Sequence, residues 1–492
     1  MMSRVAHADH EAVIGLELHV QLQTASKLFC GCSTRFGAAP NTQVCPVCLG
    51  YPGALPVVNE KAVEMALRLA AAAGARSAAA SVFARKSYFY PDLPKGYQIS
   101  QYDRPLATGG AVRFTGDGGE RDVPLIRIHL EEDAGKSLHG GGTGEETRID
   151  LNRCGVPLAE VVTEPVLRSP AEARACVAAV RRLVQYLDVS DGNMEEGSLR
   201  CDANVSLRRR GEARLGVPVE IKNLNSLRNL ERGLEAAIGR RLSDLARGET
   251  AAHRTLLYDE ATGEVRVMRA KESAPDYRYF PEPDLPPLVL DRDALDAARA
   301  ALPELPWERR ARLRRDFALA PDAAAELTRT REEAEFFEAC LVSLRAELPR
   351  HDLAHLARTV AAWTVGELRR VRKERGAGGG EAPVAPGALA RLLQRIVEGA
   401  LTIPSAKTVL EEMARSGRAA DEIIAAEGLG RIGDPDQLRE LVRAAFTDHP
   451  QQLAELRAGK EPLINFFVGR VMRAAGGRAD PQLVRRIVQE EI

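Results

Sequence analysis

Alternating apolar and polar positions near the start of the chain predict a β-strand. From Leu16 to Leu22 every second residue is apolar, and the positions between carry Glu17, His19 and Gln21. A period of two is typical of a strand with one buried face and one polar face. Comparable strand patterns follow at residues 124–130, 203–207 and 217–221.

A different period, of three to four residues, predicts helices between these strands. Asn59 followed by Val63, Leu67 and Ala70 is typical of an alanine-rich helix that begins at a side-chain cap. The same helical period appears at residues 170–187 and 227–248.

The pattern changes after the proline-rich run at residues 280–287, beyond which helical patterns rich in Ala, Leu, Arg and Glu continue to the end. Glycine and proline gather again at residues 375–386, which is typical of a loop or linker. The chain is therefore predicted to be α+β: a β-rich domain with a mixed or antiparallel sheet, then an all-α helical domain and an all-α tail. We expect these domains at residues 1–295, 296–405 and 406–492.

The composition is that of an ordinary globular protein, with 45% hydrophobic and 28% charged residues among 492. We expect neither a secretion signal nor a membrane span, because no apolar run approaches the length that crosses a bilayer. We therefore also expect the protein to be cytoplasmic. The net charge of -1 neither indicates nor excludes a nucleic-acid partner, because basic and acidic residues can be segregated in space.

Four of the eight cysteines crowd one short stretch, as Cys30-x-Cys32 and, after a gap of twelve residues, Cys45-x-x-Cys48. Two close pairs can each reach one tetrahedral ion, and thiolates suit zinc. Four thiolates leave no open coordination position, so the predicted zinc is structural. The alternative is a set of unpaired buried thiols, as we expect for the scattered Cys154, Cys176, Cys201 and Cys340.

Ionisable residues recur at a period of two on several predicted strands. Glu17 with His19, Asp202 with Asn204, and Glu220 with Lys222 each leave one face of a strand, and carboxylates follow His129 at the end of another. Gathered carboxylates repel unless a cation lies among them, and Mg²⁺ prefers oxygen ligands. Taken singly, each pair is equally typical of a solvated surface.

Three further segments have two interpretations each. The aromatic and basic stretch at residues 85–98 can stack bases and hold phosphates, or simply pack a loop. The glycine run at residues 140–144 lacks the strand-loop-helix context of a phosphate loop and is predicted to be a hairpin tip. In the tail, Lys460, Arg470 and Arg473 form either a basic stripe for RNA phosphates or a solvated helix face.

Six longer motifs, in this order, resemble the signatures of one family, GatB, which is the B subunit of the aspartyl/glutamyl-tRNA amidotransferases. They lie at residues 14–20, 88–95, 130–136, 195–204, 220–226 and 276–283. The resemblance runs from residue 13 to the C-terminus. It implies a β-rich cradle domain, a helical domain and a helical tail that grips tRNA.

The chemistry implied by the resemblance has two steps. ATP phosphorylates the side-chain carboxylate of an amino acid already esterified to tRNA, and ammonia then displaces the phosphate. The Mg²⁺-binding catalytic residues carried over are Glu17, His19, Glu132, Asp202 and Glu220. Strict strand alternation favours Glu131 over Glu132, and this alternative stays open.

Other residues take roles by the same resemblance or by charge. Lys86 and Lys95 are similar to residues that line the family's ammonia path. Lys136, Arg153 and Lys222 are candidates for phosphate or substrate contacts by charge alone.

The chain shows no glycine- and serine-rich amidase signature, so we expect a partner to release ammonia from glutamine. The resemblance names the partners as an amidase (GatA) and a small protein that wraps the pair (GatC), in a heterotrimer, with a non-discriminating synthetase as a further candidate. The expected substrates are Glu-tRNA(Gln), Asp-tRNA(Asn) or both. Two competing hypotheses are a zinc-stabilised RNA-binding module without catalysis and a scaffold that holds an amidase to tRNA.

Overall fold

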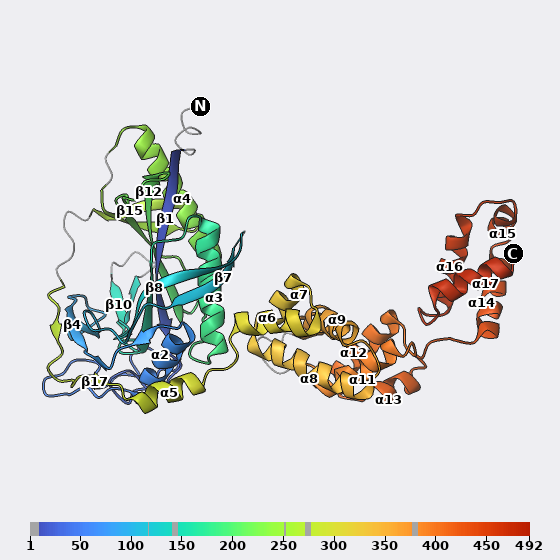
Figure 1. Ribbon diagram of the computed structural model, residues 1–492, viewed down its shortest axis with the longest axis horizontal. Coiled ribbons are helices and arrows are strands. Elements are labelled where there is room, and N and C mark those ends of the chain that lie inside the picture. The colour runs from blue at the N-terminus through green and yellow to red at the C-terminus, as the bar shows by residue number, and fades with distance from the viewer. Residues whose placement is uncertain (1–8, 117, 140–145, 250–251, 271–276, 376–381) are drawn as a thin grey trace. The chain divides into compact units, whose positions relative to one another are not determined.

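The computed structural model describes residues 9–116, 118–139, 146–249, 252–270, 277–375 and 382–492 (Figure 1). The chain divides into two compact units, Met1–Trp307 and Glu308–Ile492. The glycine run at residues 140–144, residues 376–381 of the linker predicted at 375–386, and Asp276 of the last motif lie outside the described residues. No described helix is both long and apolar enough to span a bilayer.

The first unit is built on a ten-stranded sheet with the order β15-β14-β13-β12-β1-β11-β8-β6-β2, and β7 pairs with β8. Only the β13–β14 pair is parallel among the described strands of this sheet; the other pairs are antiparallel. The strands are β1 (His10–Gln21), β2 (Arg76–Ser77), β6 (Ala107–Thr108), β7 (Ala111–Gly116), β8 (Gly119–Glu132), β11 (Pro157–Thr163), β12 (Leu199–Arg209), β13 (Val219–Lys222), β14 (Arg254–Asp259) and β15 (Glu264–Ala270). The predicted mixed sheet is confirmed.

Helices cover one face of this sheet. In β1 the side chains of Leu16, Leu18 and Val20 are buried in one continuous core with apolar residues of three helices. These are α2 (Glu60–Ala72), α3 (Pro170–Tyr186) and α4 (Leu227–Ala246), which lie beside the strands in Figure 1. Each buried Leu or Val contributes about 1.5–3 kcal/mol to folding, so this face fixes the register of β1.

The covering helices begin where the sequence predicts. The side chains of Asn59, Ser169 and Ser226 cap α2, α3 and α4 by accepting hydrogen bonds from backbone N–H groups of the first turn. The three helices predicted from the 3.6-residue period are confirmed.

Smaller sheets flank the large one. A three-stranded sheet contains β16 (Phe280–Pro281), β4 (Ala84–Ser87) and β5 (Tyr97–Ser100), in that order. Two-stranded sheets pair β3 (Ala80–Ser81) with β17 (Leu288–Val289), and β9 (Lys136–His139) with β10 (Thr147–Asp150). The helix α5 (Arg292–Ala300) contacts α2. The aromatic and basic segment thus lies in a defined sheet, because β4 and β5 contain both of its ends.

The second unit is helical, as predicted, and contains two hydrophobic cores. One core extends from Leu313 to Ile423 and the other from Ile432 to Val488. The first contains α6 (Pro306–Phe317), α7 (Pro321–Leu327), α8 (Arg331–Glu347), α9 (Leu353–Trp363), a π-helical turn (Thr364–Leu368), α10 (Arg369–Glu374), α11 (Pro386–Val397), α12 (Ile403–Ser416) and α13 (Ala420–Ala426). The second contains α14 (Pro435–Asp448), α15 (Pro450–Arg457), α16 (Leu463–Ala474) and α17 (Pro481–Glu490). The domain limits at residues 295 and 405 stay predictions.

Candidate functional site

The face of the sheet opposite the helices carries ionisable side chains from four adjacent strands. Glu17 of β1 lies opposite Asp202 of β12, and His19 of β1 lies between Arg200 of β12 and Glu160 of β11. Because the side chains of a strand alternate between faces, each of these residues leaves the sheet on the side away from the helices. The register therefore brings together residues that are far apart in sequence.

The centre of this face is a group of five residues that we call the histidine–glutamate cluster: Glu17, His19, His129, Glu131 and Glu160. The Nε2 atom of His19 lies 3.4 Å from Glu160 Oε2, 3.5 Å from Glu131 Oε1 and 3.8 Å from Glu17 Oε1. The Nε2 atom of His129 lies 3.5 Å from Glu160 Oε2 and 3.9 Å from Glu131 Oε2. His129, Glu131 and Glu160 are buried, whereas His19 and Glu17 are partly open to solvent.

Protons balance the charges of this cluster when no metal ion is present. Burial opposes the charge on His19, but the hydrogen bond to Glu160 and the charge of Glu131 outweigh it and raise the pKa of His19 to about 9. Burial and the neighbouring Glu160 raise the pKa of Glu131 to about 7. Burial lowers the pKa of His129 to about 4, so that imidazole is neutral at pH 7. The buried Glu131 and Glu160 and the partly exposed Glu17 thus share one protonated histidine, an arrangement that attracts a further cation.

The neutral His129 has a defined orientation. The Nε–H of Arg127 donates to His129 Nδ1 at 3.3 Å, so the proton of the imidazole is on Nε2, which faces Glu160 and Glu131. Arg127 Nη2 also lies 3.7 Å from Glu160 Oε1. His129 and Arg127 therefore hold the Glu160 carboxylate in place.

A second acidic group lies on the neighbouring strands. Lys222 Nζ is 2.7 Å from Asp202 Oδ2 and 3.0 Å from Glu220 Oε1. The hydroxyl of Thr255 donates to Glu220 Oε2 at 3.0 Å. Although burial opposes its charge, Asp202 and Glu220 raise the pKa of Lys222 above its ordinary value. Lys222 is 38% exposed, so its ammonium group can also contact an anion that enters from solvent.

The structure does not bring Glu132 to this face. Glu132 ends β8 on the opposite side from Glu131, where it forms a buried ion pair with Lys95 and accepts the N–H of Ile99 at 2.8 Å. The physical reason is that the alternation of β8 continues to its last residue without a bulge there. Of the five residues carried over as a metal site, Glu17, His19, Asp202 and Glu220 share the polar face and Glu132 does not.

Two members of the cluster, Glu160 and His129, were not among the metal-binding residues that the family resemblance implied. The signal for Glu160 is a single carboxylate inside the apolar run Pro157–Thr163, where a charge is costly without partners. The signal for His129 is its period-two spacing from Glu131. A glutamate or a histidine is also common on a protein surface, so the residue type alone does not identify either of them as a site residue.

The two lysines expected on an ammonia path take different positions. Lys95 is buried against Glu132. Lys86 Nζ lies 4.8 Å from the centre of the Tyr277 ring. Burial opposes the charge of Lys86, but Glu131 and nearby groups raise its pKa above the ordinary value.

The other charged candidates differ in how open they are to a ligand. Arg153 donates to the carbonyl oxygens of Ala134 and Gly135 at 2.9 and 2.7 Å, so its guanidinium holds the loop that follows β8. Lys136 is exposed on β9. In the tail, Lys460 pairs with Glu455 at 2.7 Å. On α16, Arg473 is exposed and Arg470 is half-buried.

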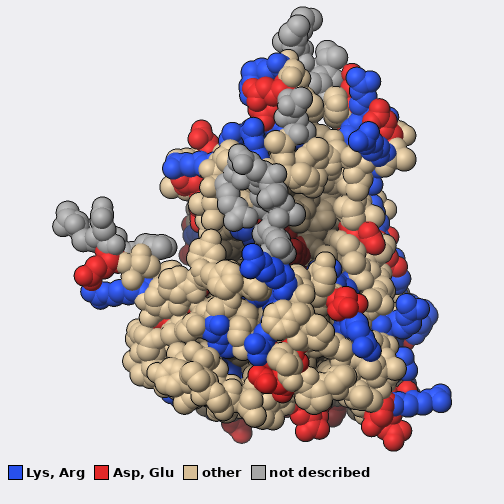
Figure 2. Space-filling model, turned by 90° about the vertical axis from the view of Figure 1, so that its left-hand side faces the viewer, with Lys and Arg blue, Asp and Glu red and all other residues tan. Residues whose placement is uncertain are grey.

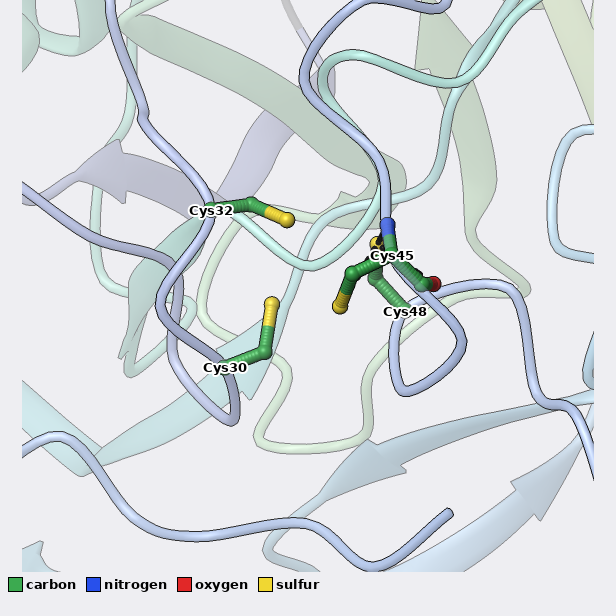
Figure 3. Close-up of side chains that lie close together, drawn as sticks. All are labelled: Cys30, Cys32, Cys45 and Cys48. Atoms are coloured by element: carbon green, nitrogen blue, oxygen red, sulfur yellow. Dashed lines mark hydrogen bonds between the residues drawn. The ribbon is translucent and has the colours of Figure 1, made fainter.

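The four clustered cysteines meet in space, and Figure 3 shows their thiols pointing toward a common centre. Their Sγ atoms all lie within 4.8 Å of one another. The Sγ atoms of Cys45 and Cys48 are 3.9 Å apart. Sulfur atoms bound at about 2.3 Å to a tetrahedral zinc are about 3.8 Å apart, so the spacing fits such an ion. Cys154, Cys176, Cys201 and Cys340 are buried, as expected.

A fully buried lysine adjoins these thiols. Lys27 Nζ donates to Gln43 O at 2.7 Å and Leu151 O at 3.4 Å, and it lies 3.6 Å from Cys48 Sγ. Among the described residues, no carboxylate forms an ion pair with Lys27. A buried cation without an anion is costly, and a thiolate cluster would offset that cost.

Fold and site together define an α+β protein whose sheet presents an acidic centre on one face and a four-thiol centre nearby. Residues 12–296 match the family described as GatB/GatE catalytic domain, and residues 351–492 match the GatB domain. The B subunit of the aspartyl/glutamyl-tRNA(Asn/Gln) amidotransferase of Moorella thermoacetica is 48% identical over 485 residues, which are 98% of this chain and 100% of that protein. The corresponding protein of Geobacter sulfurreducens is 46% identical over 486 residues, 98% of this chain and 99% of the relative. The chain belongs to the GatB family of aspartyl/glutamyl-tRNA amidotransferases, as its motifs predicted.

The raised pKa of His19 gives a testable dependence of stability on pH. In the folded protein His19 holds its proton up to a pKa of about 9, against 6.5 in the unfolded chain. Its contribution, about 3 kcal/mol, is therefore fully present below about pH 6.5 and is lost as the pH rises through about 9. In metal-free buffer we expect His19→Asn to lower the melting temperature markedly at about pH 6 and much less at about pH 9.5.

Thermal unfolding of the two proteins at both pH values checks this expectation. The matched control is His355→Asn, because His355 is an exposed residue of α9 that lies outside the histidine–glutamate cluster. A melting-temperature difference for His19→Asn that does not narrow at high pH would contradict the charge balance described above.

Proposed function

We propose that this chain is the ATP-dependent, transamidating component of a tRNA amidotransferase. It phosphorylates the side-chain carboxylate of Glu or Asp esterified to tRNA, and then amidates that group with ammonia from a partner amidase. The observation that carries the proposal is the gathering of five carboxylates, two histidines and Lys222 on one face of the sheet. The curated relatives are named for tRNA(Asn/Gln) amidotransfer, which supports the substrate class.

The residues of this face fit divalent cations. Donor atoms of Glu17, His19 and Glu160 lie within 4.8 Å of one another, and so do those of His129, Glu131 and Glu160. We propose that Glu17, His19, Glu131 and Glu160 hold one Mg²⁺ and that Asp202 and Glu220 contribute to a second site. Bound Mg²⁺ would supply neutralisation of the charge on the transferred phosphoryl group. Glu131 replaces Glu132 in this proposal because it lies beside His19.

The chain's own groups position the reaction around these sites. Lys222 bridges Asp202 and Glu220 and is open enough to contact a phosphate. Arg200 Nη2 lies 2.9 Å from Asp133 Oδ2, and this ion pair, in which only Asp133 is buried, fixes the end of β8 next to Glu131. A carboxylate is a poor acyl donor until one of its oxygens becomes part of a good leaving group. Phosphorylation before attack by ammonia is therefore the chemically reasonable order.

We propose that the buried Glu132–Lys95 pair and Lys86 line the route by which ammonia arrives. Lys95 is 6% exposed and Glu132 is 1% exposed, so the pair is a buried polar element in this part of the protein. The absence of an amidase signature in the sequence supports a separate glutaminase, GatA, in a heterotrimer completed by GatC. Glutamine is then the amide donor of the assembled enzyme.

We propose that Cys30, Cys32, Cys45 and Cys48 bind a structural Zn²⁺. The sulfur spacing and the buried Lys27 both support an anionic, metal-bound cluster over four neutral thiols. Such an ion would tie the loop after β1 to the loop that contains Cys45 and Cys48. Its role is to hold the chain rather than to react, since no ligand position is left open.

We also propose that the tail binds the tRNA body through Arg470 and Arg473. Within the described part of the chain neither of them has an ion-pair partner, whereas Arg439 and Arg443 pair with acidic residues of their own bundle. A guanidinium without a protein carboxylate is available to a phosphate.

The kinase step is tested by Asp202→Asn and Glu220→Gln in the purified heterotrimer. With ammonium chloride as the nitrogen donor, we expect each change to reduce Glu-tRNA-dependent ATP hydrolysis by about 100-fold, because metal and phosphate contacts are lost. The dissociation constant for tRNA should stay within about twofold.

Glu64→Gln is the matched control, since it neutralises an exposed carboxylate on α2 whose ion-pair partner, among the residues that the structure describes, is Lys61. The measurements are ATP hydrolysis with and without charged tRNA, and equilibrium tRNA binding. Full hydrolysis in both site variants would refute the proposal and favour an RNA-binding or scaffolding role.

The tail is tested by the double change Arg470→Ala with Arg473→Ala. We expect weaker tRNA binding and a slope of log Kd against log salt that is smaller by about 1–2, because two phosphate contacts release fewer counterions. Arg439→Ala with Arg443→Ala is the control pair in the same bundle. Superimposable salt titrations for the first double variant and the unchanged protein would rule out this contact.

A further inference from the structure

Three tyrosines form a continuous aromatic surface that the proposed mechanism leaves unused. The rings of Tyr102 and Tyr279 are stacked, with centroids 4.0 Å apart and planes 6° apart. Tyr277 meets Tyr279 edge to face at 6.0 Å, and Lys86 lies over the ring of Tyr277. We call Tyr102, Tyr277 and Tyr279 the tyrosine platform.

A small sheet fixes the platform. Tyr102 follows β5, and Tyr277 and Tyr279 precede β16; both strands pair with β4. The N–H of Ser87 also donates to the carbonyl oxygen of Tyr277 at 2.9 Å. The platform is therefore preorganised, although its members come from segments about 175 residues apart.

The platform is not core packing. Tyr102 is 53% exposed, whereas Tyr186 and Tyr258 are fully buried. One face of the Tyr102 ring stacks on Tyr279, so the exposed fraction leaves aromatic surface open to a ligand. An open π-face on a rigid support is the feature that nucleic-acid-binding proteins use to stack a base.

The platform lies beside the histidine–glutamate cluster. Ser100 ends β5 two residues before Tyr102, and its hydroxyl donates a hydrogen bond to Glu131 Oε2 at 3.2 Å. Figure 2 views the first unit from the side on which β4 and β17 lie in Figure 1, and basic and acidic side chains surround a hollow in this face.

We propose that the tyrosine platform binds an adenine base. The proposal rests on the proposed function, because both substrates of that reaction carry adenine: ATP, and the 3′-terminal adenosine to which the amino acid is esterified. In either case the base would stack on Tyr102 while the phosphate or the aminoacyl carboxylate reaches the neighbouring cluster. Lys86 lies over the ring of Tyr277 at the platform, where a cation can steer an anionic substrate.

The test compares Tyr102→Ala with Tyr102→Phe in the heterotrimer. The probes are AMP-PNP with Mg²⁺ and a tRNA acceptor minihelix that ends in CCA. We expect Tyr102→Ala to raise the Kd of one probe by about 5- to 100-fold, the range for loss of one base-stacking contact. Tyr102→Phe keeps the ring and should stay within about twofold of the unchanged complex. Tyr51→Ala is the control, because Tyr51 is similarly exposed, at 59%, but lies outside both the platform and the aromatic stretch at residues 85–98.

The two arms identify the source of the adenine. A shift for AMP-PNP alone assigns the platform to ATP. A shift for the minihelix alone assigns it to the terminal adenosine, and a minihelix with an abasic 3′-terminal nucleotide should then bind the unchanged and Tyr102→Ala complexes equally.

Unchanged affinities for both probes would overturn the proposal, and so would an equal loss in Tyr102→Phe, which would point to the hydroxyl group instead of the ring. These results are distinct from failure of the proposed function, which would appear as an unchanged complex that neither hydrolyses ATP nor amidates charged tRNA.

Discussion

The alternation of apolar and ionisable side chains along β1 determines both faces of the large sheet. Leu16, Leu18 and Val20 are held in the helix-covered core, so Glu17 and His19 must leave the strand on the opposite face. A slip of one residue would bury a carboxylate and an imidazole against α3 and expose three large aliphatic side chains. The packing of the hydrophobic core on one face of the sheet therefore fixes the positions of the charged side chains on the other face.

Charge balance is the second constraint on this face. Carboxylates from β1, β8, β11, β12 and β13 lie close enough to repel, and the folded chain offsets them with the proton on His19, with Lys222 and with Arg200. The same reasoning applies to the four thiols beside the buried Lys27. Both centres are places where the fold tolerates concentrated charge of one sign because an opposite charge is built in or bound. The proposed reaction uses this property, since ATP and a carboxylate substrate both bring negative charge.

Local sequence patterns predicted those features of the site that depend on residues close together in the chain. The spacing of Cys30, Cys32, Cys45 and Cys48 predicted their convergence, and the period of two predicted that Glu17 and His19 share a face. The choice between Glu131 and Glu132 shows the limit of motif transfer. Alternation alone favoured Glu131, and the structure places that residue beside His19.

The remaining site residues depend on pairings between distant segments. Glu160 reaches His19 only because β11 lies between β1 and β8. Glu160 belongs to none of the six motifs, and the apolar run around it does not indicate which strand β11 pairs with. The stack of Tyr102 on Tyr279 likewise requires β5 and β16 to meet β4. Long-range strand order is set by the sum of many packing contacts, so the patterns of single segments do not predict it.

The central claim is that this chain activates a tRNA-bound carboxylate by phosphorylation. The most direct measurement uses Glu-tRNA or Asp-tRNA with ¹⁸O in both side-chain carboxylate oxygens, the heterotrimer, ATP and ammonium chloride. The carboxylate oxygen that attacks the γ-phosphorus leaves with phosphate when ammonia displaces it. The account therefore predicts one ¹⁸O atom in each inorganic phosphate released with amide formation. Unlabelled phosphate formed alongside the amidated product would contradict it.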